Sequence, residues 1–130
     1  VKLRHLPHWT RRRQAVAARY QALLAGAPDL GVPAVAGGRT HVWHLFVIET
    51  GDRDGLAAHL AARGIGTVIN YPRALPFLPA YARLGHRPED FPVAHRQQGR
   101  ILSLPIFAEL TEAQQDEVAG AVLDFLNGRA

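Results

Sequence analysis

The sequence predicts a single domain of the α+β class. Apolar residues recur at helical spacing near the start, in residues 6–24, and near the end, after Thr111. Between these segments, residues 41–49 carry β-branched and aromatic side chains at both alternating sets of positions, which is typical of a strand with two covered faces. A chain of 130 residues can bury one hydrophobic core, so residues 1–130 are predicted to form one domain.

The first predicted helix and the connection after it follow from periodicity and composition. Residues 6–24 are amphipathic, with Tyr20 on the apolar face, and Gly26 ends the pattern. Residues 27–40 are rich in Gly, Pro and Ala, which predicts a connection with a short extended piece at residues 32–35.

A strand and a capped helix are expected next. Because the strand at residues 41–49 is apolar on both sides, we expect helices on one face and another part of the protein, such as a further domain, on the other. His44 lies among these apolar residues and is predicted to be a buried, satisfied histidine. Asp52 suits the N-cap of a helix at residues 53–63, and Gly64 suits its left-handed end.

The rest of the chain alternates short elements with proline-rich turns. The sequence predicts a strand at residues 65–71, a helical turn at residues 79–84, a short helix at residues 93–99 and a brief strand at residues 101–104. Thr111 and Gln114 have the spacing of a capping box, which places the start of the last helix.

Composition narrows the functional classes. The chain has no cysteine, which excludes disulfides, thiolate metal sites and a cysteine nucleophile and permits a reducing compartment. A cytoplasmic location is expected. No apolar run approaches the ~20 residues of a membrane span, so no membrane partner is expected. The net charge of +4 is spread along the chain, which argues against nucleic acid as a partner. The seven histidines show no metal-ligand spacing, so no metal site is predicted.

Catalytic groups are scarce. Ser103 is the only serine and lies outside any nucleophile motif. Lys2 is the only lysine, so chemistry that needs a buried Schiff-base lysine is not carried by these residues, and no catalytic residue is predicted. The chain has no methionine and begins at Val1 within continuing structure, from which we expect it to be a piece of a longer protein.

The stretch of residues 64–81, GIGTVINYPRALPFLPAY, is the candidate functional edge. A strand that ends in Asn70, Tyr71 and Arg73 and then enters a proline-rich loop sets polar groups at a sheet edge, where ligands are commonly held. The alternative is a proline-rich structural turn that packs Phe77 and Tyr81 onto the core.

Three stretches, in this order and spacing, resemble the C-terminal part of DegT/DnrJ/StrS-type sugar aminotransferases. They are VKLRHLPHWTRRRQAVAARYQALL, HVWHLFVIETGDRDGLAAHLAARGIGT and FPVAHRQQGRILSLPIFAELTEAQ. The resemblance implies the small C-terminal domain of a fold-type I enzyme, an antiparallel sheet of about three strands with helices packed on one face. It also implies pyridoxal phosphate as cofactor and amino transfer from glutamate to a nucleotide-linked keto sugar in a homodimer.

In such enzymes the Schiff-base lysine and most cofactor contacts belong to the large N-terminal domain, so no cofactor-binding residue is expected here. The resemblance implies substrate contacts by Asn70, Tyr71 and Arg73: Asn70 positioning the substrate, Tyr71 stacking on or bonding to the sugar, and Arg73 pairing with a phosphate or the glutamate carboxylate. Many relatives carry histidine at position 70 and another in the following loop, which leaves the substrate open. A pyridoxal-phosphate-dependent sugar dehydratase and a non-catalytic ligand-binding or regulatory module remain as alternatives.

Overall fold

The sheet of the computed structural model, which describes residues 1–128, has three antiparallel strands in the order β1-β2-β3. The strands are β1 (Leu30–Gly31), β2 (Phe46–Thr50) and β3 (Ile101–Leu104). The central strand pairs Phe46 with Leu104 on one side and Thr50 with Leu30 on the other. The predicted small antiparallel sheet is therefore confirmed.

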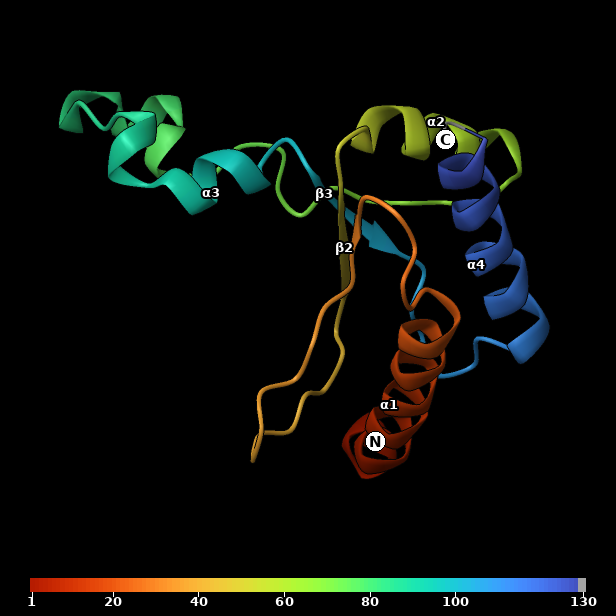
Figure 1. The fold of residues 1–130 in the computed structure, drawn as a ribbon. Coiled ribbons are helices and arrows are strands. Elements are labelled where there is room, and N and C mark those ends of the chain that lie inside the picture. Colours follow the sequence, from red (N-terminus) through yellow and green to blue (C-terminus); the bar gives the residue numbers. More distant parts are fainter. Residues whose placement is uncertain (129–130) are drawn as a thin grey trace.

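Three helices cover one face of this sheet, as predicted (Figure 1). They are α1 (Leu6–Leu23), α2 (Arg53–Ala62) and α4 (Glu112–Asn127), and a short turn, η1 (Lys2–His5), precedes the first. The core between helices and sheet holds side chains that are fully buried or nearly so, among them Val16, Tyr20, Phe46, Ile48, Leu56, Leu60, Leu102 and Val122. Burial of this apolar surface is the main stabilising contribution to the body.

Local capping explains where two of these helices begin. The Asp52 carboxylate accepts a hydrogen bond of 3.0 Å from the Gly55 backbone N–H at the start of α2. At the start of α4, the Thr111 hydroxyl and the Gln114 side chain each accept a bond from the other residue's backbone N–H. Gly64, just beyond α2, has a φ of 74°, as expected for a left-handed helix end.

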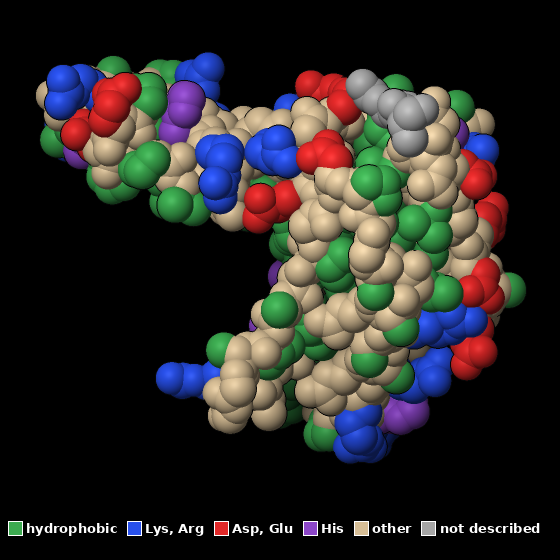
Figure 2. Space-filling view, in the orientation of Figure 1, with side chains coloured by type: hydrophobic (Ala, Val, Ile, Leu, Met, Phe, Trp, Pro, Cys, Tyr) green, Lys and Arg blue, Asp and Glu red, His purple; other side chains and the backbone are tan. Residues whose placement is uncertain are grey.

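Residues 71–100 form an arm that projects away from the body (Figure 1). The arm contains η2 (Leu75–Phe77), η3 (Pro79–Leu84), η4 (Pro88–Asp90) and α3 (Pro92–Gln97). Figure 2 shows an open concave side between this arm and the rest of the molecule. The turn predicted at residues 79–84 and the short helix after Pro92 are both present.

The aromatic residues of the arm pack on one another. The Phe77 ring lies 6.5 Å from the Phe91 ring and 5.3 Å from the His95 ring, measured between ring centroids. His86 lies 5.0 Å from Phe91. Phe77 therefore belongs to a small cluster within the arm and not to the main core, which differs from the structural alternative drawn from the sequence.

The strand predicted at residues 41–49 is shorter than expected, because β2 begins only at Phe46. Trp43 has a φ of 52°, in the left-handed region, and its backbone N–H donates to the His41 Nδ1 atom at 2.9 Å. This local turn prevents residues 41–45 from joining the ladder. It also leaves His44 exposed, so its prediction as a core histidine is wrong.

The strand predicted at residues 65–71 is also wrong as a full strand. Only Val68 pairs with the sheet, through an isolated bridge to Ser103. The third strand is instead β1, which lies just before the extended piece predicted at residues 32–35. A third strand could have come from residues 65–71 or from β1. Which segment pairs with the sheet depends on contacts that are distant in sequence.

Asp29 joins three parts of the body near the end of β2. Its carboxylate accepts hydrogen bonds from the Gly51 backbone N–H at 2.7 Å and from Arg100 at 3.1 Å. The Thr50 hydroxyl also donates to it, at 3.4 Å. The Gly51 N–H and the Arg100 guanidinium together hold the pKa of Asp29 below its ordinary value.

Replacing Asp29 with asparagine is expected to lower the melting temperature at neutral pH. A depressed pKa means that the charged form adds stability above the unfolded-state pKa of about 3.9, and that this is lost as the pH falls through the folded-state pKa. Asparagine tolerates the left-handed φ of 50° at this position, so the substitution tests mainly the charge. Thermal melts of both proteins between neutral and acidic pH should converge at low pH, and an unchanged difference would contradict this assignment.

Candidate functional site

The predicted residues Asn70, Tyr71 and Arg73 lie where the chain leaves the sheet and enters the arm. Just before them, Val68 and Ser103 exchange backbone hydrogen bonds of 3.3 and 2.8 Å. The peptide bond between Asn70 and Tyr71 is cis. The bridge between Val68 and Ser103 therefore fixes the point at which the chain leaves the sheet.

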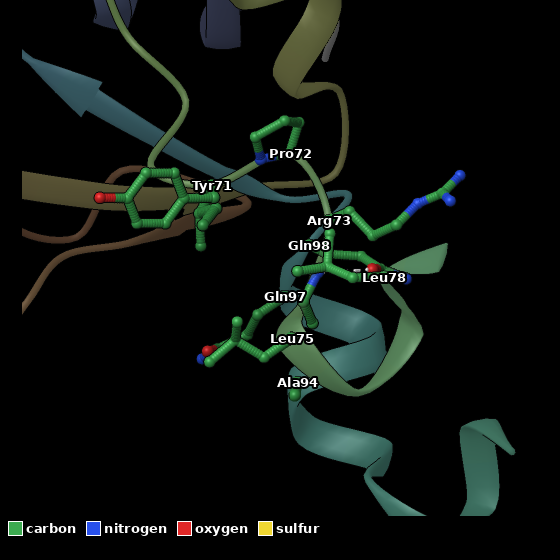
Figure 3. A pocket seen from close by; sticks show the side chains of 10 residues that line it. Tyr71, Pro72, Arg73, Leu75, Leu78, Ala94, Gln97 and Gln98 are labelled. Carbon is green, nitrogen blue, oxygen red and sulfur yellow. Dashed lines mark hydrogen bonds between the residues drawn. The ribbon is translucent and has the colours of Figure 1, made fainter. Parts of the chain in front are cut away.

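A cavity of about 530 Å³ lies at the base of the arm, and we call it the arm-root pocket (Figure 3). Its lining residues are Tyr71, Pro72, Arg73, Ala74, Leu75, Leu78, Ala94, Gln97, Gln98 and Ile101. Most of the lining is apolar, and the polar groups come from the rim residues and from two adjacent glutamines. A mostly apolar pocket with a few polar groups is the common form of a small-molecule site.

Tyr71 and Arg73 both border this pocket but extend in opposite directions from the intervening Pro72 (Figure 3). The Tyr71 residue is 74% exposed. Arg73 is also exposed and borders a second cavity of about 370 Å³ beside Phe77. Within residues 1–128, Arg73 has no hydrogen bond or ion pair, so its guanidinium is available to an anionic group.

Asn70 lines a different cavity. This cavity of about 260 Å³ is bordered by Asn70, Ser103 and the exposed His44, among other residues. The Ser103 hydroxyl donates to the Asn70 Oδ1 atom at 3.0 Å, which leaves the Asn70 amide nitrogen able to donate to a ligand. The structure thus places Tyr71 and Arg73 in one pocket and Asn70 in another.

Two glutamines that sequence reasoning missed hold the base of the arm, one by a bond within the arm and one by a bond to β2. The Gln98 Oε1 atom accepts a bond of 3.0 Å from the Ala74 backbone N–H. The Gln97 Nε2 atom donates to a Glu49 carboxylate oxygen of β2 at 2.7 Å. The only available signal was a pair of amides at the end of the short helix predicted at residues 93–99, where polar side chains are ordinarily solvated.

Arg53, at the start of α2, supports the same junction from the body side. Its Nη1 atom donates to the Gln98 carbonyl oxygen at 3.0 Å, and its Nε atom pairs with Asp54 at 2.6 Å. Only 12% of the Arg53 side chain is exposed. The guanidinium is therefore held in place between α2 and the end of α3.

The described residues do not by themselves fit a pyridoxal-phosphate site, because the cofactor needs a lysine for attachment. The only lysine, Lys2, lies in the exposed turn η1, away from the arm-root pocket.

Tyr20 is buried and donates to the Pro105 carbonyl oxygen at 3.1 Å, and burial raises its pKa well above the ordinary value. Tyr20 is thus a structural group that remains protonated.

Two further absences hold for the described part of the chain. Residues 1–128 contain no group of three or more His, Asp or Glu side chains placed to hold a metal ion. None of the helices in that range has the length and apolar character required to cross a bilayer.

Solved structures define the class of this fold. Streptomyces venezuelae DesV, solved in complex with a ketimine intermediate, is similar to 96% of this chain over 34% of its own length, with 40% identity and a TM-score of 0.88. A DegT DnrJ EryC1 StrS aminotransferase from Brucella abortus has 36% identity and the same TM-score of 0.88 over 96% of this chain and 33% of its own. The fold is that of the corresponding part of fold-type I aminotransferases.

The sequence profile of the DegT/DnrJ/EryC1/StrS aminotransferase family matches residues 1–123, and the chain belongs to this family. The family depends on pyridoxal phosphate.

Curated relatives agree with this assignment. The erythromycin biosynthesis sensory transduction protein EryC1 of Saccharopolyspora erythraea is 42% identical over 91% of this chain and 32% of its own length. The dTDP-3-amino-3,4,6-trideoxy-alpha-D-glucose transaminase of Streptomyces venezuelae is 41% identical over 96% of this chain and 33% of its own. The chain spans about a third of the length of the curated relatives it matches.

Proposed function

We propose that this chain acts as the C-terminal small domain of a pyridoxal-phosphate-dependent aminotransferase that moves an amino group from glutamate to a nucleotide-linked keto sugar. The observation that carries the proposal is the family match over residues 1–123. Relatives named as transaminases of dTDP-linked amino sugars support this substrate class. We further propose a cytoplasmic homodimer as the working form.

In this proposal the chain binds and encloses substrate, while the bond-making groups come from the rest of the enzyme. The cofactor, when bound there, supplies the carbonyl chemistry that exchanges the amino group. Lys2 is the only lysine of the chain and is exposed, which supports a separate source for the cofactor's lysine. The isolated chain is accordingly expected to be catalytically inactive.

The geometry supports a division of the substrate contacts among the three predicted residues. The exposed, unpaired Arg73 guanidinium suits a phosphate or carboxylate oxygen, for which its fork of donors is well shaped. Tyr71 offers an exposed aromatic face at the rim of an apolar pocket. Asn70, oriented by Ser103, offers an amide donor in a separate cavity.

A hybrid enzyme tests the proposal. The part of the Streptomyces venezuelae transaminase that matches this chain would be replaced by residues 1–130, leaving the remainder of that enzyme intact. We expect the hybrid to bind pyridoxal phosphate and to aminate a nucleotide-linked keto sugar with a kcat of about a tenth of the parent value or better, because the substrate side of the site is preserved. The isolated chain, mixed with cofactor and both substrates, should give no turnover.

The matched control is a hybrid carrying the corresponding part of the Micromonospora megalomicea transaminase, which bears the same activity name as the parent. If that control is active while the hybrid with this chain binds cofactor but produces no amino sugar, the proposed function is contradicted.

A non-catalytic regulatory module is the second candidate. Its support is the name of one relative, the pleiotropic regulatory protein of Geobacillus stearothermophilus, which is 41% identical over 96% of this chain. The same hybrid separates the two, because a purely regulatory domain would not restore amino transfer.

A further inference from the structure

We propose that Gln98 is a positioning residue that sets the placement of Tyr71 and Arg73 for substrate binding. The inference rests on the proposed function. Its basis is the 3.0 Å bond from the Ala74 backbone N–H to the Gln98 side-chain oxygen, which joins residues separated by 24 positions in the sequence.

The segment that carries Tyr71 and Arg73 has little else to hold it. Within the described residues, the Ala74 bond is the one hydrogen bond from the backbone of residues 71–74 to any part of the chain beyond the helical turn η2 that follows. Tyr71 and Arg73 themselves are exposed. Their positions therefore depend on contacts to either side: the Val68 bridge and the Ser103–Asn70 bond before them, and Gln98 after them.

Gln98 is itself fixed from two directions, so it can act as a reference point. Its backbone N–H donates to the Ala94 carbonyl oxygen at 3.2 Å at the end of α3. Its carbonyl oxygen accepts from the largely buried Arg53 of α2 at 3.0 Å. Through Gln98, the 70–74 segment is therefore connected to helix α2 of the body as well as to the arm.

The bond needs an acceptor, which makes the role testable by substitution. Gln98→Ala removes the acceptor oxygen, whereas Gln98→Glu keeps an oxygen that can accept from the Ala74 N–H. Gln21→Ala is the matched control, because Gln21 also makes one side-chain bond to a distant backbone group, the Pro33 carbonyl oxygen at 2.7 Å, far from the pocket. All three substitutions would be made both in the 130-residue chain and in the hybrid enzyme.

Two measurements are combined. In the chain, hydrogen exchange at the Ala74 amide should accelerate about tenfold in Gln98→Ala and stay near the native rate in the other two variants. In the hybrid, Gln98→Ala should raise the KM for the sugar nucleotide about fivefold with kcat within about twofold, and Gln98→Glu, which keeps the acceptor oxygen but adds a charge to the pocket, should raise this KM less than Gln98→Ala does.

The outcomes separate the inference from the function on which it rests. An active hybrid in which Gln98→Ala leaves KM unchanged would overturn the inference alone. Equal losses in Gln98→Ala and Gln98→Glu, or a loss of kcat without a change in KM, would indicate a general structural role and would also overturn it. An inactive hybrid with native Gln98, beside an active control hybrid, would contradict the proposed function and remove the basis for positioning.

Discussion

Replacing Phe46 with alanine is expected to lower the free energy of unfolding by about 3–5 kcal/mol, the usual cost of deleting a fully buried aromatic side chain. Phe46 is 0% exposed on the central strand. Its ring centroid lies 5.1 Å from that of Tyr20 and 5.6 Å from that of Trp43. Since small domains are stabilised by about 5–15 kcal/mol in total, this single change should remove a large share.

Urea unfolding followed by circular dichroism measures this effect. Val42→Ala serves as the control, because Val42 is 61% exposed in the connection before β2 and should change stability by only about 0.5 kcal/mol or less. A cost below about 1 kcal/mol for Phe46→Ala would mean that the core does not centre on this residue.

Replacing Arg73 with alanine is expected to raise the KM of the hybrid enzyme for one of its two substrates, the sugar nucleotide or the amino donor, about tenfold or more. The reason is that charge-assisted hydrogen bonds contribute about 1.5–3 kcal/mol. The KM that rises identifies the anion: the sugar nucleotide if Arg73 binds a phosphate, or the amino donor if it binds a carboxylate. Lysine at this position should retain part of the effect, since it keeps the charge but loses the planar fork.

Arg83→Ala is the control for Arg73. Arg83 is another exposed arginine of the arm, and within the described residues its side chain bonds only to the Ala80 carbonyl oxygen at 3.3 Å, in its own turn. Both KM values should stay native in this variant. Unchanged kinetics in Arg73→Ala would remove Arg73 from the substrate site.

Helix positions could be predicted from sequence because their signals are local. The N-cap at Asp52 and the capping box at Thr111 depend on bonds to residues three positions away, and both are present in the structure. The left-handed glycines at the helix ends likewise need only their own backbone freedom, as Gly64 and Gly85 show.

Strands were predicted less well because their pairing is non-local. The composition of residues 41–49 favours a strand, yet the turn at Trp43 removes the first half from the ladder. The two residues of β1 carry almost no strand signal, and they pair with β2 because Asp29 holds the chain against Gly51.

The candidate site could be predicted only in part, because some of its contacts are local in sequence and others are not. The prolines of the 64–81 stretch and the family resemblance both singled out Tyr71 and Arg73, and the structure puts them on one pocket. The separation of Asn70 into another pocket depends on its bond to Ser103, across 33 positions. Gln98 reaches Ala74 across 24 positions, and no local pattern reports such a contact.

Product formation by the hybrid enzyme tests the central claim most directly. Mass spectrometry of the reaction with glutamate and a nucleotide-linked keto sugar would detect replacement of the carbonyl oxygen by an amino group. The account predicts that this product forms with residues 1–130 in place and not with the isolated chain. A hybrid that binds pyridoxal phosphate and yields no amino sugar, beside an active control hybrid, would contradict it.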